Sequence, residues 1–121
     1  MKYALIGCGR ISPNHIAAAI KNNLDIVAVC DIIPENMENI LGKFDIDSSN
    51  IKRYTNYIEM LEIEKPELVA IATESGKHAK IALDCLDRGA NIIIEKPIAI
   101  PNFKRRLQEY LIVKFHFFLW S

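Results

Sequence analysis

Apolar and polar positions follow one another in blocks along the chain, and the lengths of these blocks predict alternating strands and helices. Short apolar runs predict strands near Lys2–Ile6, Ile26–Cys30, Arg53–Tyr54, Leu68–Ala72 and Asn91–Ile94. Segments with helical spacing lie between them, at about Ser12–Asn22, Pro34–Lys43, Tyr57–Glu62 and Ser75–Arg88. The predicted fold class is therefore α/β, with a doubly wound parallel sheet and helices on both faces.

Composition and charge narrow the classes of protein to consider. The 121 residues suffice for one domain, and 15 basic and 15 acidic residues give a formal net charge of zero. No positive field favours nucleic acid or an anionic membrane, and no apolar run reaches the roughly 18 residues of a membrane span. Since Met1 and Lys2 lead directly into a predicted core strand, we expect no signal peptide and a cytoplasmic location. Cys8, Cys30 and Cys85 lack C-x-x-C spacing, so we expect reduced, buried thiols and no metal site.

A glycine turn follows the first predicted strand and opens the first predicted helix. The segment GCGRISP, residues 7–13, has two of the three glycines of the G-x-G-x-x-G dinucleotide-binding pattern, with Ser12 in the third place. Gly7 permits a tight turn, and Gly9 lets backbone amides approach a pyrophosphate at the positive end of the helix. Ser12 is small enough for close helix–strand packing and is placed to cap the helix ahead of Pro13. An ordinary glycine-rich turn is the alternative interpretation.

A carboxylate ends the second predicted strand, at the distance from the glycine turn that ribose recognition requires. Asp31 lies about 20 residues beyond the turn and is predicted to bind the ribose hydroxyls of a dinucleotide. Its charge repels a 2′-phosphate, and Ile32, Ile33 and Pro34 add no basic group. We therefore predict NAD as the cofactor, in preference to NADP. The alternatives for Asp31 are a solvated strand-end carboxylate and a cap of the next helix.

Three segments together carry a family resemblance. The segments GCGRI (residues 7–11), ATESGKH (72–78) and GANIIIEKP (89–97) resemble the N-terminal domain of the Gfo/Idh/MocA oxidoreductases. The resemblance covers residues 1 to about 100 and implies a Rossmann-like fold and NAD-dependent hydride transfer between a sugar hydroxyl carbon and nicotinamide. Within the family, the chain looks most like the branch that oxidises the 3-hydroxyl of UDP-linked N-acetyl sugars.

The resemblance assigns roles to single positions. Lys96 takes the catalytic position, in contact with the substrate hydroxyl and helping its deprotonation, with a solvated strand-end lysine as the alternative. Glu95 is expected to reach toward the nicotinamide ribose, and Pro97 to fix the turn. His15 and His78 are expected to pack or cap rather than to catalyse. The predicted cofactor-binding residues are Gly7, Gly9, Arg10, Ile11, Asp31, Ile32, Thr73, Glu95, Lys96 and Pro97.

The resemblance stops near residue 100. We expect residues 1–100 to form the dinucleotide-binding domain and residues 101–121 to form an atypical hydrophobic tail, with the substrate domain absent. Asn102 is placed to cap a last helix ending near Lys114, which leaves the following aromatic residues uncovered and predicts self-association into a homo-oligomer. A basic helix on a membrane surface is the alternative. The composition of the tail is also typical of a frameshift, an abrupt stop or the boundary of an expressed fragment.

These observations predict one half of an oxidoreductase active site. Without the half that positions substrate, we expect little or no activity from the chain alone. The expected partners are a dinucleotide and a second copy of the chain, with a sugar or nucleotide-sugar only in a full-length parent, and neither nucleic acid nor membrane. A non-catalytic nucleotide-binding module that self-associates through its tail is the alternative function, and a folding remnant without function is a third.

Overall fold

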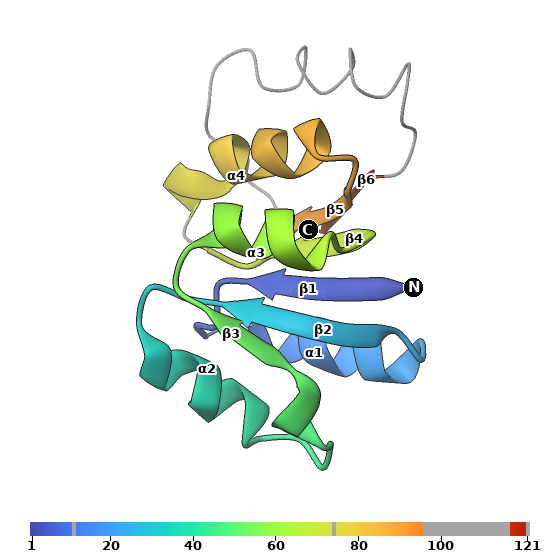
Figure 1. Ribbon diagram of the computed structural model, residues 1–121, viewed down its shortest axis with the longest axis vertical. Helices are drawn as coiled ribbons and strands as arrows, with labels where there is room; N and C mark the ends of the chain where they lie inside the picture. The colour runs from blue at the N-terminus through green and yellow to red at the C-terminus, as the bar shows by residue number, and fades with distance from the viewer. Residues whose placement is uncertain (11, 74, 96–116, 121) are drawn as a thin grey trace.

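Strands and helices alternate from the first residues of the chain (Figure 1). The computed structural model describes residues 1–10, 12–73, 75–95 and 117–120. Its strands are β1 (Lys2–Ile6), β2 (Asp25–Cys30), β3 (Lys52–Tyr54), β4 (Leu68–Ile71), β5 (Asn91–Glu95) and β6 (Phe117–Trp120). Its helices are α1 (Ser12–Lys21), α2 (Pro34–Leu41), α3 (Tyr57–Glu64) and α4 (Ser75–Asp87), together with a 3₁₀ turn at Ser48–Asn50. The predicted strands and helices are therefore confirmed to within about two residues at each end.

The strands form one parallel sheet in the order β3-β2-β1-β4-β5-β6. The first half of the chain builds outward from β1 on one side, and the second half builds outward from β4 on the other. Between β1 and β4 the order reverses, so the loops that follow these two strands diverge. A doubly wound sheet binds its ligands at such a switch point, beyond the carboxyl ends of the strands.

Successive residues of β1 point to opposite faces of the sheet, and each face is covered by two helices. Tyr3 and Leu5 belong to the cluster that includes side chains of α1 and α2. Ala4 and Ile6 belong to the cluster that includes side chains of α3 and α4. All four side chains are at most 3% exposed. Burial on both faces explains why the central strands are continuous apolar runs rather than alternating ones.

The sixth strand is a feature that the sequence pattern does not predict. β6 pairs in parallel with β5, with Ile92 opposite Phe117 and Glu95 opposite Trp120. The backbone of residues 117–120 therefore forms the last strand of the sheet, next to β5. The prediction that the aromatic side chains are uncovered concerns side chains that the structure does not describe. Four apolar residues in a row do not distinguish a strand from a helix, although aromatic residues favour strands. The predicted last helix, from Asn102 to Lys114, lies outside the described residues.

Candidate functional site

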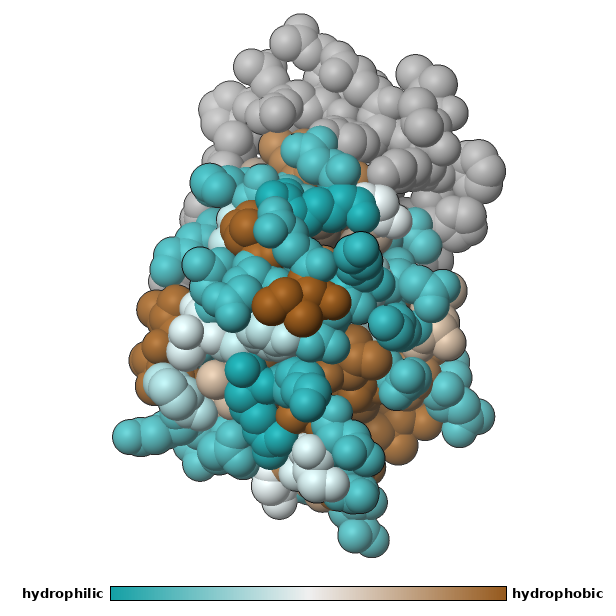
Figure 2. Space-filling view, in the orientation of Figure 1, coloured by the Kyte–Doolittle hydropathy of each residue, from teal (hydrophilic) through white to brown (hydrophobic). Residues whose placement is uncertain are grey.

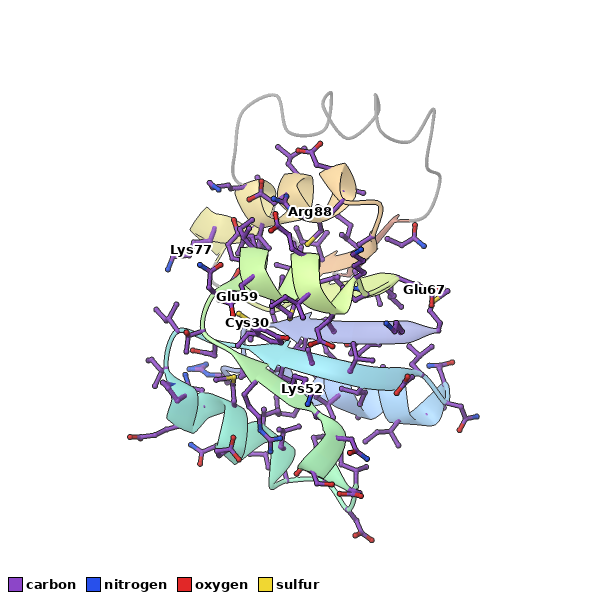
Figure 3. The ribbon with its side chains drawn as sticks, in the orientation of Figure 1. Cys30, Lys52, Glu59, Glu67, Lys77 and Arg88 are labelled. Carbon is purple, nitrogen blue, oxygen red and sulfur yellow. The ribbon has the colours of Figure 1, made fainter. Side chains whose placement is uncertain are left out.

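A cleft of about 360 Å³ opens at the edge of the sheet where the parallel strands end. Figure 3 shows Cys30 and Lys77 at this edge and Glu67 at the opposite one. The cleft receives residues from the loops after β1, β2, β3 and β4, which is the arrangement expected at the switch point. The described residues that line it are Ile6, Gly7, Gly9, Cys30, Asp31, Ile32, Ile33, Asn36, Thr55, Tyr57, Ala72, Thr73, Lys77 and Ile81.

Gly7 occupies a position that other residues cannot take without strain. Its φ is +93°, and a Cβ built on it would lie 2.7 Å from the carbonyl carbon of Ala72 and 2.7 Å from the amide nitrogen of Thr73. Its amide donates to the carbonyl oxygen of Cys30 at 2.8 Å. The glycine therefore lets the end of β1 pass directly against the end of β4.

Gly9 differs from Gly7, because a Cβ on Gly9 would have no protein atom within 4 Å. Space therefore remains next to the backbone, where a ligand can approach it. Within the described part of the chain, the amides of Gly9 and Arg10 donate to no protein acceptor. They lie just ahead of α1, where unpaired amides and the helix dipole favour an anion.

Two other amides in the described part of the loop, those of Gly7 and Cys8, are already engaged. Gly7 donates to Cys30, and the amide of Cys8 donates to the Oδ2 atom of Asp31 at 2.8 Å. Among the described residues, the amides that remain available to a pyrophosphate are therefore those of Gly9 and Arg10, and Ile11 lies outside the described residues. Ser12 requires a correction: it lies inside α1, and its hydroxyl donates to the carbonyl oxygen of Gly9 at 2.6 Å instead of capping the helix. Its burial agrees with the expected role of a small packing residue.

Asp31 links the ends of β1 and β2. Its Oδ2 atom accepts from the amide of Cys8 and, at 3.4 Å, from the side-chain amide of Asn36. Its Oδ1 atom accepts from the amide of Ile33 at 2.8 Å, which forms the turn that leads into α2. A carboxylate has about four acceptor positions. Three are used here, so Asp31 can still accept a ligand hydroxyl from the cleft.

The rim of the cleft beside Asp31 is apolar. Ile32 and Ile33 are 72% and 51% exposed, which is unusual for isoleucine. In Figure 2, apolar surface interrupts the hydrophilic face at the left edge, beside the loop between β2 and α2. On the α4 side of the cleft lies Lys77, and no described carboxylate is within ion-pair distance of its ammonium group. Asp31 and Lys77 are the charged groups among the described lining residues.

Thr73 and His78 join the end of β4 to α4. The Nε2 atom of His78 hydrogen-bonds the carbonyl oxygen of Thr73, and the His78 side chain is 3% exposed. The Oγ1 atom of Thr73 and the Nδ1 atom of His78 are buried without a partner among the described residues. His15 is also buried, and its carbonyl oxygen accepts from the hydroxyl of Tyr3 at 3.1 Å. The placement of both histidines fits their predicted packing roles.

The three thiols are buried and unbonded to one another. Burial and the charge of Asp31 raise the pKa of Cys8 to about 12, and the same two causes raise the pKa of Cys30 to about 12. Burial also raises the pKa of Cys85. These thiols are therefore protonated at neutral pH and poor nucleophiles. Among the described residues there is no cluster of metal-binding side chains.

The structure brings together five of the predicted cofactor-binding residues, places Arg10 outside the lining of the cleft, and does not describe the side chains of the others. Gly7, Gly9, Asp31, Ile32 and Thr73 line the cleft. Arg10 is exposed and is not among the lining residues. Glu95 is the last residue of β5, and its side chain is not described. Ile11, Lys96 and Pro97 lie outside the described residues.

Several lining residues were not predicted from the sequence. They come from the start of α2, the loop before α3, and the helices α3 and α4: Asn36, Thr55, Tyr57, Lys77 and Ile81. Apart from Lys77, which belongs to the segment ATESGKH, no local motif marks these residues, because the crossover connections of the chain bring them to the cleft. Thr55 and Tyr57 closely follow the predicted strand that ends at Tyr54, which is the signal that was available for these two residues.

The comparisons with known proteins identify the family of this fold. The profile of the family described as "Oxidoreductase family, NAD-binding Rossmann fold" matches residues 1–110. The inositol 2-dehydrogenase of Salmonella typhimurium is 28% identical over 102 residues, which are 83% of this chain and 30% of the relative. The D-apiose dehydrogenase of Paraburkholderia graminis is 33% identical over 100 residues, which are 82% of this chain and 26% of the relative.

Solved structures show the same architecture. The WlbA dehydrogenase of Bordetella pertussis, in complex with NADH and UDP-GlcNAcA, superposes with a TM-score of 0.78 at 26% identity. The match covers 96% of this chain and 36% of that protein. The chain thus spans about a third or less of the length of the relatives and structures compared here. Of the helices described, none has the length and apolar character needed to cross a membrane.

Proposed function

The chain belongs to the Gfo/Idh/MocA oxidoreductase family, and we propose that it is the NAD-binding part of a sugar dehydrogenase. The reaction of the whole enzyme would be hydride transfer between a hydroxyl-bearing carbon of a sugar and nicotinamide. One observation supports the proposal: the amides of Gly9 and Arg10, which donate to no acceptor among the described residues, and the carboxylate of Asp31 line or border the same cleft. This combination matches a ligand with a pyrophosphate and a neighbouring diol.

In this proposal the described residues bind and orient the dinucleotide. The amides of Gly9 and Arg10 would hold the pyrophosphate, and the open acceptor position of Asp31 would hold the ribose. Gly7 keeps β1 close to β4, so that the loop and Thr73 border one cleft. The bound cofactor would supply the hydride acceptor, and the chain supplies its placement.

We propose Lys96 as the acid–base residue of the reaction. It lies outside the described residues, but it directly follows Glu95, the last residue of β5. β5 runs parallel to β4, so its carboxyl end is at the same edge of the sheet as the cleft. A lysine there would be placed to take a proton from a sugar hydroxyl. Glu95 and Pro97 keep their proposed supporting roles at the nicotinamide side.

The substrate class and the cofactor preference belong to the same proposal. A nucleotide-linked sugar is supported by the ESGKH segment after Thr73 and by the likeness to the WlbA dehydrogenase crystallised with UDP-GlcNAcA. NAD is preferred to NADP in this proposal because Asp31 would repel a 2′-phosphate. The nearest basic group of the described lining, Lys77, lies on the α4 side of the cleft.

Calorimetric titration of the purified chain with NAD and NADP tests the proposal. We expect saturable binding of NAD and weaker binding of NADP. We also expect no reduction of NAD in the presence of a UDP-linked sugar, because orientation by a substrate domain contributes about 7–11 kcal/mol in well-organised cases. Tighter binding of NADP, or turnover by this chain alone, would contradict the proposal.

Self-association and location complete the proposal. We expect the purified chain to form a homo-oligomer, and analytical ultracentrifugation tests this expectation. A chain that remains monomeric at all concentrations would contradict self-association. A cytoplasmic location is supported by the three unpaired thiols, because such thiols are typical of a reducing compartment.

A further inference from the structure

The chain beyond β4 is fixed on both sides of Thr73. On the side of the strand, the amide of Ala72 donates to the carbonyl oxygen of Ile6 at 2.8 Å, and the peptide between Ala72 and Thr73 passes directly against Gly7. On the side of the helix, the Nε2 atom of His78, the fourth residue of α4, hydrogen-bonds the carbonyl oxygen of Thr73. A side chain of α4 therefore reaches back and holds the loop that leads into this helix.

His78 is a polar residue on the buried face of α4. Ile81 and Ala82 follow it one turn later on the same face, and the three side chains are 3%, 5% and 0% exposed. Because a carbonyl oxygen only accepts, the Nε2 atom of His78 carries a proton, and in the neutral ring Nδ1 is an acceptor. Nδ1 has no partner among the described residues, and burying it without one costs stability. An apolar side chain avoids this cost, and such departures from the stable choice concentrate at functional positions.

Thr73 does not hold its own side chain in place. The residue lines the cleft, but its Oγ1 atom is buried and has no partner among the described residues. Most buried hydroxyls form a hydrogen bond that fixes the side chain. Since this hydroxyl forms none there, the position of the Thr73 side chain depends on the backbone on either side of it. That backbone is fixed by the contact with Gly7 and by the imidazole of His78.

We propose that His78 is a positioning residue for cofactor binding: by holding the carbonyl oxygen of Thr73, it places the side chain of Thr73 at the wall of the cleft. The inference rests on the proposed function, because the ligand of the cleft is the dinucleotide. His78 is not among the lining residues, so it acts on the ligand through Thr73 alone. Without the imidazole donor, the carbonyl group would turn toward another donor or water and move Thr73 with it.

The test compares two replacements of His78 that differ in their ability to donate a hydrogen bond. Calorimetry measures the binding of NAD to the full chain for the wild type, His78→Leu and His78→Gln. His78→Leu fills the buried position without a donor, so binding is expected to weaken about three- to tenfold. His78→Gln returns an N–H donor at a similar distance from the backbone, so binding is expected to stay within about twofold of the wild type. Equal affinity for the wild type and His78→Leu would overturn the inference, and so would a His78→Gln variant as weak as His78→Leu.

Two further variants separate positioning from a purely structural role. Cys85→Ala is the matched control, because Cys85 is also buried on α4 but does not line the cleft. It is expected to lower the urea midpoint and to leave the affinity for NAD unchanged. Thr73→Ala is expected to weaken NAD binding, and adding His78→Leu to it should bring little further loss, because both changes remove the same contact. Losses that add up in the double variant would overturn the inference.

A shorter amide replaces leucine if His78→Leu does not fold, as judged by circular dichroism. The side chain of His78→Asn has the same amide group as His78→Gln but is one carbon shorter, so it does not reach the carbonyl oxygen of Thr73. Its affinity for NAD is expected to fall as for His78→Leu, and wild-type affinity would overturn the inference. A wild type that binds NAD as well as every His78 variant overturns this inference alone. A wild type that binds no NAD instead overturns the proposed function on which the inference rests.

Discussion

Replacing Gly7 with alanine tests the contact between β1 and β4 that creates the cleft. The new Cβ would lie 2.7 Å from two backbone atoms, the carbonyl carbon of Ala72 and the amide nitrogen of Thr73, and neither is the end of a flexible side chain. An alanine would also have to adopt a φ of +93°. Backbone strain costs about 1–3 kcal/mol and overpacking another 1–3 kcal/mol, so we expect a loss of about 2–6 kcal/mol in the free energy of unfolding.

Urea unfolding followed by circular dichroism measures this loss, and Gly9→Ala is the matched control. Gly9 belongs to the same loop, but a Cβ there meets no atom within 4 Å. Gly9→Ala is therefore expected to change stability by about 1 kcal/mol or less, and to weaken NAD binding because the methyl group occupies the space of the pyrophosphate. A Gly7→Ala variant as stable as the wild type would refute the reasoning about this loop. So would a Gly9→Ala variant with the larger loss of stability.

Three further predictions follow from the cleft and the buried thiols. Asp31→Ala removes the proposed ribose acceptor, so calorimetry should show that NAD binding is weakened about tenfold or more and that the preference for NAD over NADP is smaller. An unchanged preference for NAD over NADP would count against the proposed role of Asp31. Lys77→Gln should weaken NAD binding mainly at low ionic strength, whereas the same change at Lys52, an exposed residue at the start of β3, should not. Burial raises the pKa of Cys8 and of Cys30 to about 12 in the fold, above the ordinary thiol value of 9.0, so unfolding releases their protons above pH 9. The contribution of the protonated thiols to the free energy of unfolding is therefore fully present below pH 9 and falls by about 1.4 kcal/mol per pH unit and thiol toward pH 12. Urea midpoints at different pH values measure this fall. A smaller fall in Cys8→Ala supports the reasoning, and a fall identical to that of the wild type contradicts it.

The fold was predictable because burial dictates which positions along each strand and helix are apolar. A parallel strand covered on both faces must be apolar throughout, and the runs at residues 69–72 and 92–94 have this property. The helices carry their apolar residues at helical spacing, as Ile81, Cys85 and Leu86 do in α4. β6 could not be predicted in the same way. Its pairing with β5 depends on a contact between distant segments, and four apolar residues do not by themselves choose a partner.

The candidate site was predictable only where a local motif carries it. Gly7 and Asp31 follow from the glycine pattern and its distance from the next acidic strand end. The hydrogen bond between the amide of Cys8 and Asp31 was not predictable, because it depends on the register that places Ile6 opposite Cys30. Tyr57 was not predicted either, since its place in the cleft results from the crossover from β3 through α3 to β4.

A crystal structure of the chain grown with NAD tests the central claim most directly. The account predicts density for the dinucleotide in the cleft at the switch point, with its pyrophosphate on the amides of Gly9 and Arg10 and its adenosine ribose on Asp31. At saturating NAD, an empty cleft, or a dinucleotide bound at another place on the sheet, would contradict the account.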